Sequence, residues 1–160
     1  MANDPVNVYK GNFEFVKDIY PDIYDFLYTA ESEIRIDYYA SGRSLRSAFE
    51  AFLNDLVKEY RIRVFPEKGN RVSLNDNRMA LEAANKLPVI PDQEYITVKG
   101  KTKKGKAYAV LQKTGNRSSH VEAKDWDPEL NYQNLLTALR IMHSVLSAEN
   151  KRMQEQVLRA

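Results

Sequence analysis

The sequence contains no cysteine among its 160 residues, which excludes both a disulfide framework and a thiolate metal site. No uninterrupted apolar stretch approaches the ~18 residues that a membrane-spanning helix needs, and residues 1–10 lack the segments of a signal peptide. A large charge of one sign is missing too, because 24 lysines and arginines oppose 22 acids and leave a net charge of +2. We therefore expect a cytoplasmic protein without a membrane segment, in which any basic surface is local.

The remaining composition is that of a globular chain, with 43% hydrophobic and 29% charged residues. A chain of 160 residues is long enough to bury one core without covalent cross-links. No internal repeat and no low-complexity tract divides it. We expect a single domain over residues 1–160.

Apolar residues recur at three- and four-residue steps through most of the chain, which is the spacing of amphipathic helices. We expect a short helix ending near Tyr20, a second from Pro21, a third over residues 38–60, a fourth capped by Ser73 and a long last helix behind Asp127. The sequence therefore predicts an all-α fold, a helical bundle of about five helices.

The second of these helices has one apolar face, and we expect its charged residues, Glu31 among them, to fall largely outside that face. Residues 94–111 allow two interpretations. The segments 95–98 and 108–111 flank a middle rich in glycine and lysine, as the arms of a small β-hairpin do. The second arm could equally be a short helix over residues 106–113 that ends at Gly115.

Two blocks of residues resemble a known family. One combines residues 12–17 (NFEFVK) and Ala30-Glu31 with four later residues, and the other is the segment 111–120 (LQKTGNRSSH). The four later residues are Arg43, Arg46, Phe49 and Glu50. Together the blocks are similar to the helical module at the N-terminus of type I restriction endonuclease R subunits and to related stand-alone proteins, which belong to the HEPN-like superfamily.

The resemblance implies a helical bundle, expected as a homodimer, that acts in restriction or anti-phage defence. Members of such a group either cleave RNA without a metal or bind nucleic acid or a larger effector subunit without catalysis. No cofactor is implied. Whether this chain cleaves or only binds depends on the residues around its histidine at position 120.

Metal-independent RNA cleavage needs a proton-transfer group that works near neutral pH and a cation that faces the phosphate. His120 is the candidate for proton transfer, Asn116 for a phosphate or hydroxyl contact, and Lys113 for the cation. The arginine of the family segment is replaced here by Gln112, and a lysine cannot grip two phosphate oxygens as a guanidinium does. We therefore favour a binding role, with a metal-independent ribonuclease using His120 as the alternative.

A local run of positive charge is a second candidate site. It surrounds Gly100 and Gly105, with Arg117 further along, and such a segment can bind phosphates without reading sequence. Tyr95 and Tyr108 flank it and could stack on bases, RNA being favoured over DNA, while a solvated loop is the alternative. The lysines of the run are Lys99, Lys101, Lys103, Lys104 and Lys106.

Three charged residues of the third helix are at helical spacing, namely Arg43, Arg46 and Glu50. We expect an ion pair between Arg46 and Glu50, which are four residues apart; the alternative is that one arginine replaces the missing cation near His120. The second histidine, His143, is expected on the surface of its helix or at the edge of the core. With no cysteine and two distant histidines, no metal site is expected.

Overall fold

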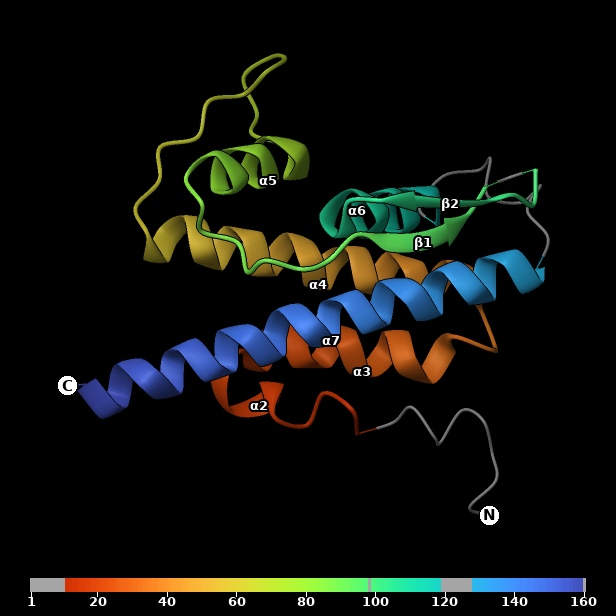
Figure 1. Ribbon diagram of the computed structural model, residues 1–160, viewed down its shortest axis with the longest axis horizontal. Coiled ribbons are helices and arrows are strands. Elements are labelled where there is room, and N and C mark those ends of the chain that lie inside the picture. The colour runs from red at the N-terminus through yellow and green to blue at the C-terminus, as the bar shows by residue number, and fades with distance from the viewer. Residues whose placement is uncertain (1–10, 98, 119–127, 160) are drawn as a thin grey trace.

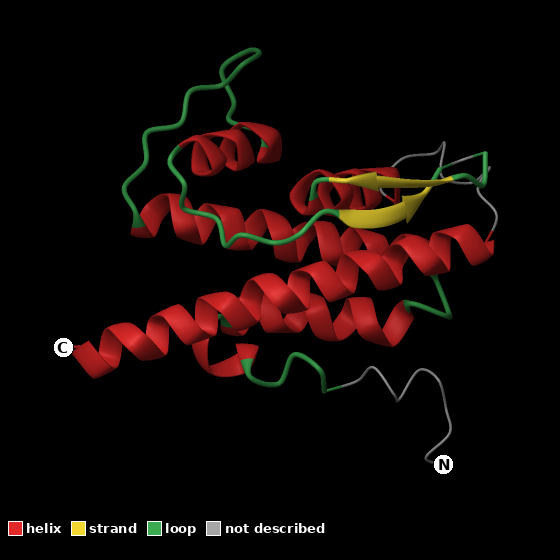
Figure 2. Ribbon diagram, in the orientation of Figure 1, coloured by secondary structure: helices red, strands yellow, loops and turns green. Residues whose placement is uncertain are grey.

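The computed structural model describes residues 11–97, 99–118 and 128–159. Within these ranges the chain forms six helices and one two-stranded sheet (Figures 1 and 2), so the expected helical bundle with a small hairpin is confirmed. In chain order the elements are α2 (Val16–Ile19), α3 (Pro21–Glu33), α4 (Tyr38–Glu59), α5 (Leu74–Ala83), β1 (Gln93–Ile96), β2 (Thr102–Gly105), α6 (Ala107–Ser118) and α7 (Pro128–Arg159).

Helix α4 is the centre of the bundle, since α3, α5, α6 and α7 all contact it. In Figure 1, α3 lies below α4, α5, α6 and the hairpin lie above it, and α7 crosses the bundle diagonally and reaches the hairpin at the right. Its buried stripe follows the predicted three- and four-residue spacing and consists of Leu45, Phe49, Phe52, Leu53 and Leu56.

The helix starts are set by local sequence. Pro21 occupies the first turn of α3, where its missing N–H is not needed. Asp37 caps α4 by accepting two backbone N–H groups at 3.0 and 3.1 Å. Ser73 and Asp76 form the predicted capping box of α5, each side chain accepting the other's backbone N–H. These caps explain why the predicted helix starts at residues 21, 38 and 74 are found.

Residues 94–111 contain both of the predicted elements, in neighbouring segments. Strand β1 pairs antiparallel with β2, so that Gln93 is opposite Gly105 and Ile96 is opposite Thr102. The prediction of residues 108–111 as a strand is wrong, because they belong to α6 and bury Tyr108, Val110 and Leu111 against the bundle. The hairpin turns earlier and takes a polar second strand instead.

Helix α6 continues through Gly115, where an end was expected. A Cβ at this position would lie 3.0 Å from Cβ and 3.3 Å from Cα of Arg46, so α6 approaches the backbone of α4 closely here. Only a residue without a side chain fits such an approach without displacing a neighbour. Gly115 therefore sets the distance between α6 and α4 and does not terminate a helix.

The C-terminal half of α7 is tied to the end of α4. Arg152 forms ion pairs with Glu149 at 2.7 Å and with Glu59 at 3.1 Å, and its guanidinium lies 5.4 Å from the centre of the Tyr60 ring. Helix α7 is 32 residues long, and polar and charged residues interrupt its apolar ones. In the described ranges, no helix has both the length and the apolarity that crossing a membrane would require.

Candidate nucleic-acid interface

The basic run of the sequence forms the β1–β2 hairpin and the residues beside it. Its five lysines, Lys99, Lys101, Lys103, Lys104 and Lys106, are all exposed. Glu94 is opposite Lys104 in the ladder, yet among the described residues none of the five forms an ion pair. The hairpin thus presents lysines that form no ion pair with an acid of the described residues.

The hairpin is fastened at its turn end by hydrogen bonds. Asn134 of α7 accepts the N–H of Ile96 at 2.9 Å and donates to the carbonyl of the same residue at 2.8 Å. At the turn, the N–H of Lys101 donates to Thr97 Oγ1 at 3.1 Å, and Gly100 has a φ of 79° that glycine adopts without strain. The solvated loop that was the alternative is therefore a hydrogen-bonded hairpin, whose strand β1 is bound to α7 and whose lysines are exposed.

A cleft of about 170 Å³ lies between the hairpin, α6 and α7. The ring of Tyr95 borders it, and Lys113 Nζ lies 5.3 Å from the centre of that ring. Its polar lining includes Asn131 of α7, and its apolar lining is formed by Ile96, Ala109, Val110 and Leu135. The cleft joins an apolar surface to the basic hairpin.

The residues predicted for catalysis have different partners. Lys113 faces Tyr95 in the cleft, whereas Asn116 Oδ1 accepts a hydrogen bond from Arg46 Nε at 3.0 Å. His120 lies outside the described residues, and so does the side chain of Arg117. The described part of the chain therefore brings Asn116 next to an arginine and Lys113 next to the hairpin.

Arg46 forms the expected ion pair with Glu50, at 3.1 Å. The same guanidinium binds Asn116, so Arg46 also connects α4 to α6. Arg43, one turn earlier, is exposed. Of the two arginines, Arg46 is thus the one that reaches the segment leading to His120.

Gln112, which stands where the family segment has arginine, contacts an arginine from another helix. Arg78 of α5 donates from Nε to Gln112 Oε1, and its other nitrogens bind Glu82 at 3.0 Å and Asn75 at 3.1 Å. Gln112 Nε2 donates to Asn75 Oδ1 at 3.2 Å. The guanidinium of Arg78 is therefore held in a closed polar cluster between α5 and α6.

Only one of the two tyrosines predicted to flank the basic run reaches the cleft. Tyr95 does, but Tyr108 is 8% exposed, its ring is stacked on Phe49 at 6.3 Å, and its hydroxyl donates to the carbonyl of Pro88 at 2.6 Å. The prediction of Tyr108 as a stacking residue is wrong, because this first turn of α6 faces α4.

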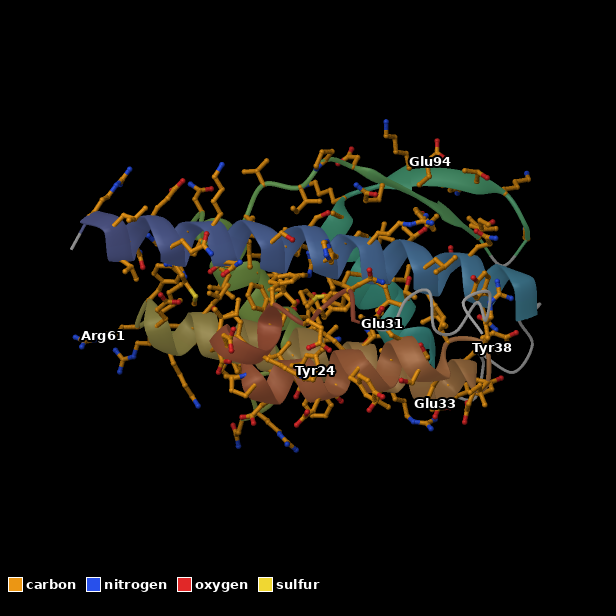
Figure 3. All side chains as sticks on the ribbon, turned by 90° about the horizontal axis from the view of Figure 1, so that it is seen from below. Tyr24, Glu31, Glu33, Tyr38, Arg61 and Glu94 are labelled. Atoms are coloured by element: carbon orange, nitrogen blue, oxygen red, sulfur yellow. The ribbon has the colours of Figure 1, made fainter. Side chains whose placement is uncertain are left out.

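Glu31, expected outside the apolar face of α3, is 2% exposed. It follows Leu27 by four residues and precedes Ile34 by three, so it shares their buried face. Figure 3 shows it between α3 and α7. Loss of solvent raises the pKa of Glu31 to about 7, although a hydrogen bond donated by Asn12 Nδ2 at 3.0 Å favours the charged form.

Glu31 borders a second cavity, of about 310 Å³, between the segment before α2 and helix α7. His143 lies at its edge, exposed, with its ring edge-on to Phe13 and Phe15 at 5.5 and 5.4 Å. The expectation that His143 lies at the edge of the core is confirmed. This cavity is on the face of the bundle opposite the hairpin.

Sequence reasoning missed Asn131 and Asn134. They are three residues apart near the start of α7 and therefore lie on one side of the helix, which was the only available signal. The role of Asn134 depends on β1, which is far away in sequence, so spacing alone could not reveal it.

Across the ranges that the structure describes, no three histidine, aspartate or glutamate side chains are grouped as metal ligands. Comparisons of the chain with protein-family models, with curated proteins and with solved structures found no match. The function of the chain therefore has to be argued from its own residues.

Proposed function

We propose that the chain is a HEPN-like helical module of a restriction or anti-phage defence system that binds single-stranded nucleic acid, RNA in preference to DNA, without strong catalysis. The HEPN-like assignment and the defence setting rest on the resemblance of residues 12–17, 30–31 and 111–120. The binding role rests on one observation. The β1–β2 hairpin presents five exposed lysines without an ion pair among the described residues, directly beside an apolar cleft.

The physical basis is counterion release. The phosphates of a nucleic acid hold a layer of small cations around it. Each lysine that contacts a phosphate releases a cation into solution, and the entropy of the released cations favours binding. With a net charge of only +2, the whole chain attracts a polyanion weakly, so binding requires a local group of cations. The hairpin supplies such a group, and its hydrogen bonds to α7 limit the order that has to be created on binding.

The side-chain interactions around Gln112 favour a binding role over cleavage. The nearby guanidinium of Arg78 already binds Gln112, Glu82 and Asn75. A phosphate would have to displace these partners to use it. Lys113, the remaining cation of this segment, is a single point charge without the fork that grips two phosphate oxygens.

The test is a fluorescence anisotropy titration of labelled single-stranded RNA, in which Lys101, Lys103 and Lys104 are replaced together by glutamine. Each lost phosphate contact reduces the slope of log affinity against log salt by about 0.7, so the three replacements reduce it by about 2. The matched control carries the same charge change at the far end of the bundle, at the exposed Lys58, Lys68 and Lys151.

Binding that weakens in the hairpin variant and not in the control supports the proposal. Equal losses in both variants would show that total charge, and not the hairpin, attracts the nucleic acid. The absence of any binding by the wild-type chain would refute the proposal.

Cleavage by His120 is the second candidate function, and the contact between Arg46 and Asn116 favours it. This contact places a guanidinium from α4 on the part of α6 that leads to His120. The test is incubation of wild type and His120→Ala with single-stranded RNA in EDTA. Metal-independent cleavage that the substitution abolishes would replace the binding role by a ribonuclease, and intact RNA with both proteins would exclude it.

We propose that the chain forms a homodimer. On α3, Phe26 is 39% exposed and Tyr28 is 44% exposed, on opposite flanks of its buried face, and aromatic side chains are enriched in protein interfaces. Light scattering during gel filtration measures the mass directly. A dimeric mass that becomes monomeric in Tyr28→Glu is the expected result, and a monomeric wild type would refute it.

A further inference from the structure

The cleft beside the hairpin has the lining of a site for a flat aromatic ring. Ala109 and Val110 of α6 form one wall, Leu135 of α7 the other, and Tyr95 of β1 contributes its ring. The ring of Tyr95 lies against Gly105, where an added Cβ would be 3.2 Å from Tyr95 Cε1. The neighbouring strand therefore fixes where the ring can be.

The size of the cleft restricts its occupant. Its volume is about 170 Å³, and an apolar cavity of about 150 Å³ is enough to hold a benzene molecule. One six-membered ring therefore fits, whereas a fused two-ring system would have to protrude. Among the components of nucleic acid, this favours a pyrimidine base over a purine.

Two polar side chains at the cleft can bind such a base and its phosphate. Asn131 is half-buried there, and its amide forms no hydrogen bond with any residue that the structure describes. An amide both donates and accepts, which matches the adjacent donor and acceptor on the pairing edge of uracil or cytosine. Lys113 is exposed and can swing from the Tyr95 ring to a phosphate, which frees the ring face for stacking.

We infer that this cleft binds one pyrimidine base of a single-stranded nucleic acid whose phosphates contact the hairpin lysines. The inference rests on the proposed function and identifies the ligand class of the same site. It requires an unpaired strand, because a base can enter the cleft only when its pairing edge is free. Stacking on Tyr95 and hydrogen bonds to Asn131 hold the base, while the lysines hold the backbone.

The test separates the base from the phosphates. Wild type is titrated with labelled oligouridine and with a sugar–phosphate strand of equal length that carries no bases. Ala109→Leu fills the cleft from an exposed position on α6, and Ala83→Leu makes the same change at the exposed end of α5 as a control. We expect the strand without bases and the Ala109→Leu variant each to lose about tenfold in affinity, the usual effect of one stacked base.

A second measurement locates the base without the polymer. Uridine monophosphate and ribose 5-phosphate, which carries the same phosphate and no base, are added to isotope-labelled protein and followed by NMR. We expect uridine monophosphate to shift the backbone signals of Tyr95 and Asn131, and ribose 5-phosphate to leave them in place. Ala109→Leu is expected to abolish the shifts.

The outcomes distinguish the two proposals. Lysine-dependent binding that is equally strong without bases, together with unshifted NMR signals, would overturn the base site and leave the nucleic-acid role intact. No binding of any strand would overturn the proposed function, and in that case shifts with uridine monophosphate would still support a nucleotide site. Shifts without selectivity for the base would show that Lys113 simply attracts anions, which contradicts the inference.

Discussion

Replacing Glu31 by glutamine removes a charge from the interior of the bundle and keeps an acceptor for the hydrogen bond from Asn12. Glu31 is 2% exposed, and loss of solvent raises its pKa from 4.5 to about 7. Because one pKa unit corresponds to about 1.4 kcal/mol, this difference amounts to ~3 kcal/mol between the two protonation states. The charged carboxylate therefore costs the folded protein about this much above neutral pH.

The pH dependence follows from the direction of the shift. Between pH 4.5 and about pH 7 the folded protein holds a proton on Glu31 that the unfolded chain has released. The contribution of Glu31 is therefore complete below pH 4.5 and is lost as the pH rises through about 7. Glu31→Gln has no such loss, so we expect it to be ~3 kcal/mol more stable than wild type at about pH 8 and closely similar at about pH 4.

Urea unfolding curves of both proteins across this pH range provide the measurement. Glu94→Gln is the matched control, because Glu94 is exposed on β1 and lies on the outside of the molecule in Figure 3. We expect its free energy of unfolding to follow that of wild type. If the curves of wild type and Glu31→Gln run parallel over the whole range, the carboxyl of Glu31 is hydrated in solution and the argument is wrong.

Three further predictions concern helix contacts and can be measured by urea unfolding. Gly115→Ala is expected to lose about 1 kcal/mol, because the clash with Arg46 outweighs the better helix propensity of alanine; a stabilised variant would contradict the close approach. Ser73→Ala removes the cap of α5 and is expected to cost ~1 kcal/mol, whereas unchanged stability would show that α5 does not need it. Gln112→Arg brings a second cation to Arg78, and we expect a loss of about 1 kcal/mol and no RNA cleavage; a stable, cleaving variant would refute this.

The helices could be predicted where a local signal decides them. The spacing of apolar residues gave α4 over nearly its whole length, and the Ser73 cap gave the start of α5. Residues 94–111 could not be resolved in the same way, because β2 is polar and has no apolar alternation of its own. Strand β1 is in turn bound by Asn134 of α7, which is 38 residues away from Ile96 in the sequence.

For the candidate nucleic-acid interface, the sequence predicts the positive charge but not the surrounding structure. The lysine run is visible in the sequence, but whether acids neutralise it depends on the fold. The burial of Glu31 also depends on the fold, because α7 covers this part of α3. A closer reading of the helix would have placed Glu31 on the apolar face, since Leu27 and Ile34 are four and three residues away.

Three arginines of the bundle differ in their partners from the lysines of the hairpin. Arg46 connects α4 to α6, Arg78 connects α5 to α6, and Arg152 connects α7 to α4. A guanidinium suits this use, because its planar fork binds several oxygens at once. The lysines of the hairpin have no such partners in the described residues, and an ammonium group suits contacts to phosphates that carry no sequence information. In the described residues, a phosphate at the segment that leads to His120 would have to displace Gln112, Glu82 and Asn75 from Arg78, or share Arg46 with Glu50 and Asn116. For this reason we propose binding ahead of cleavage.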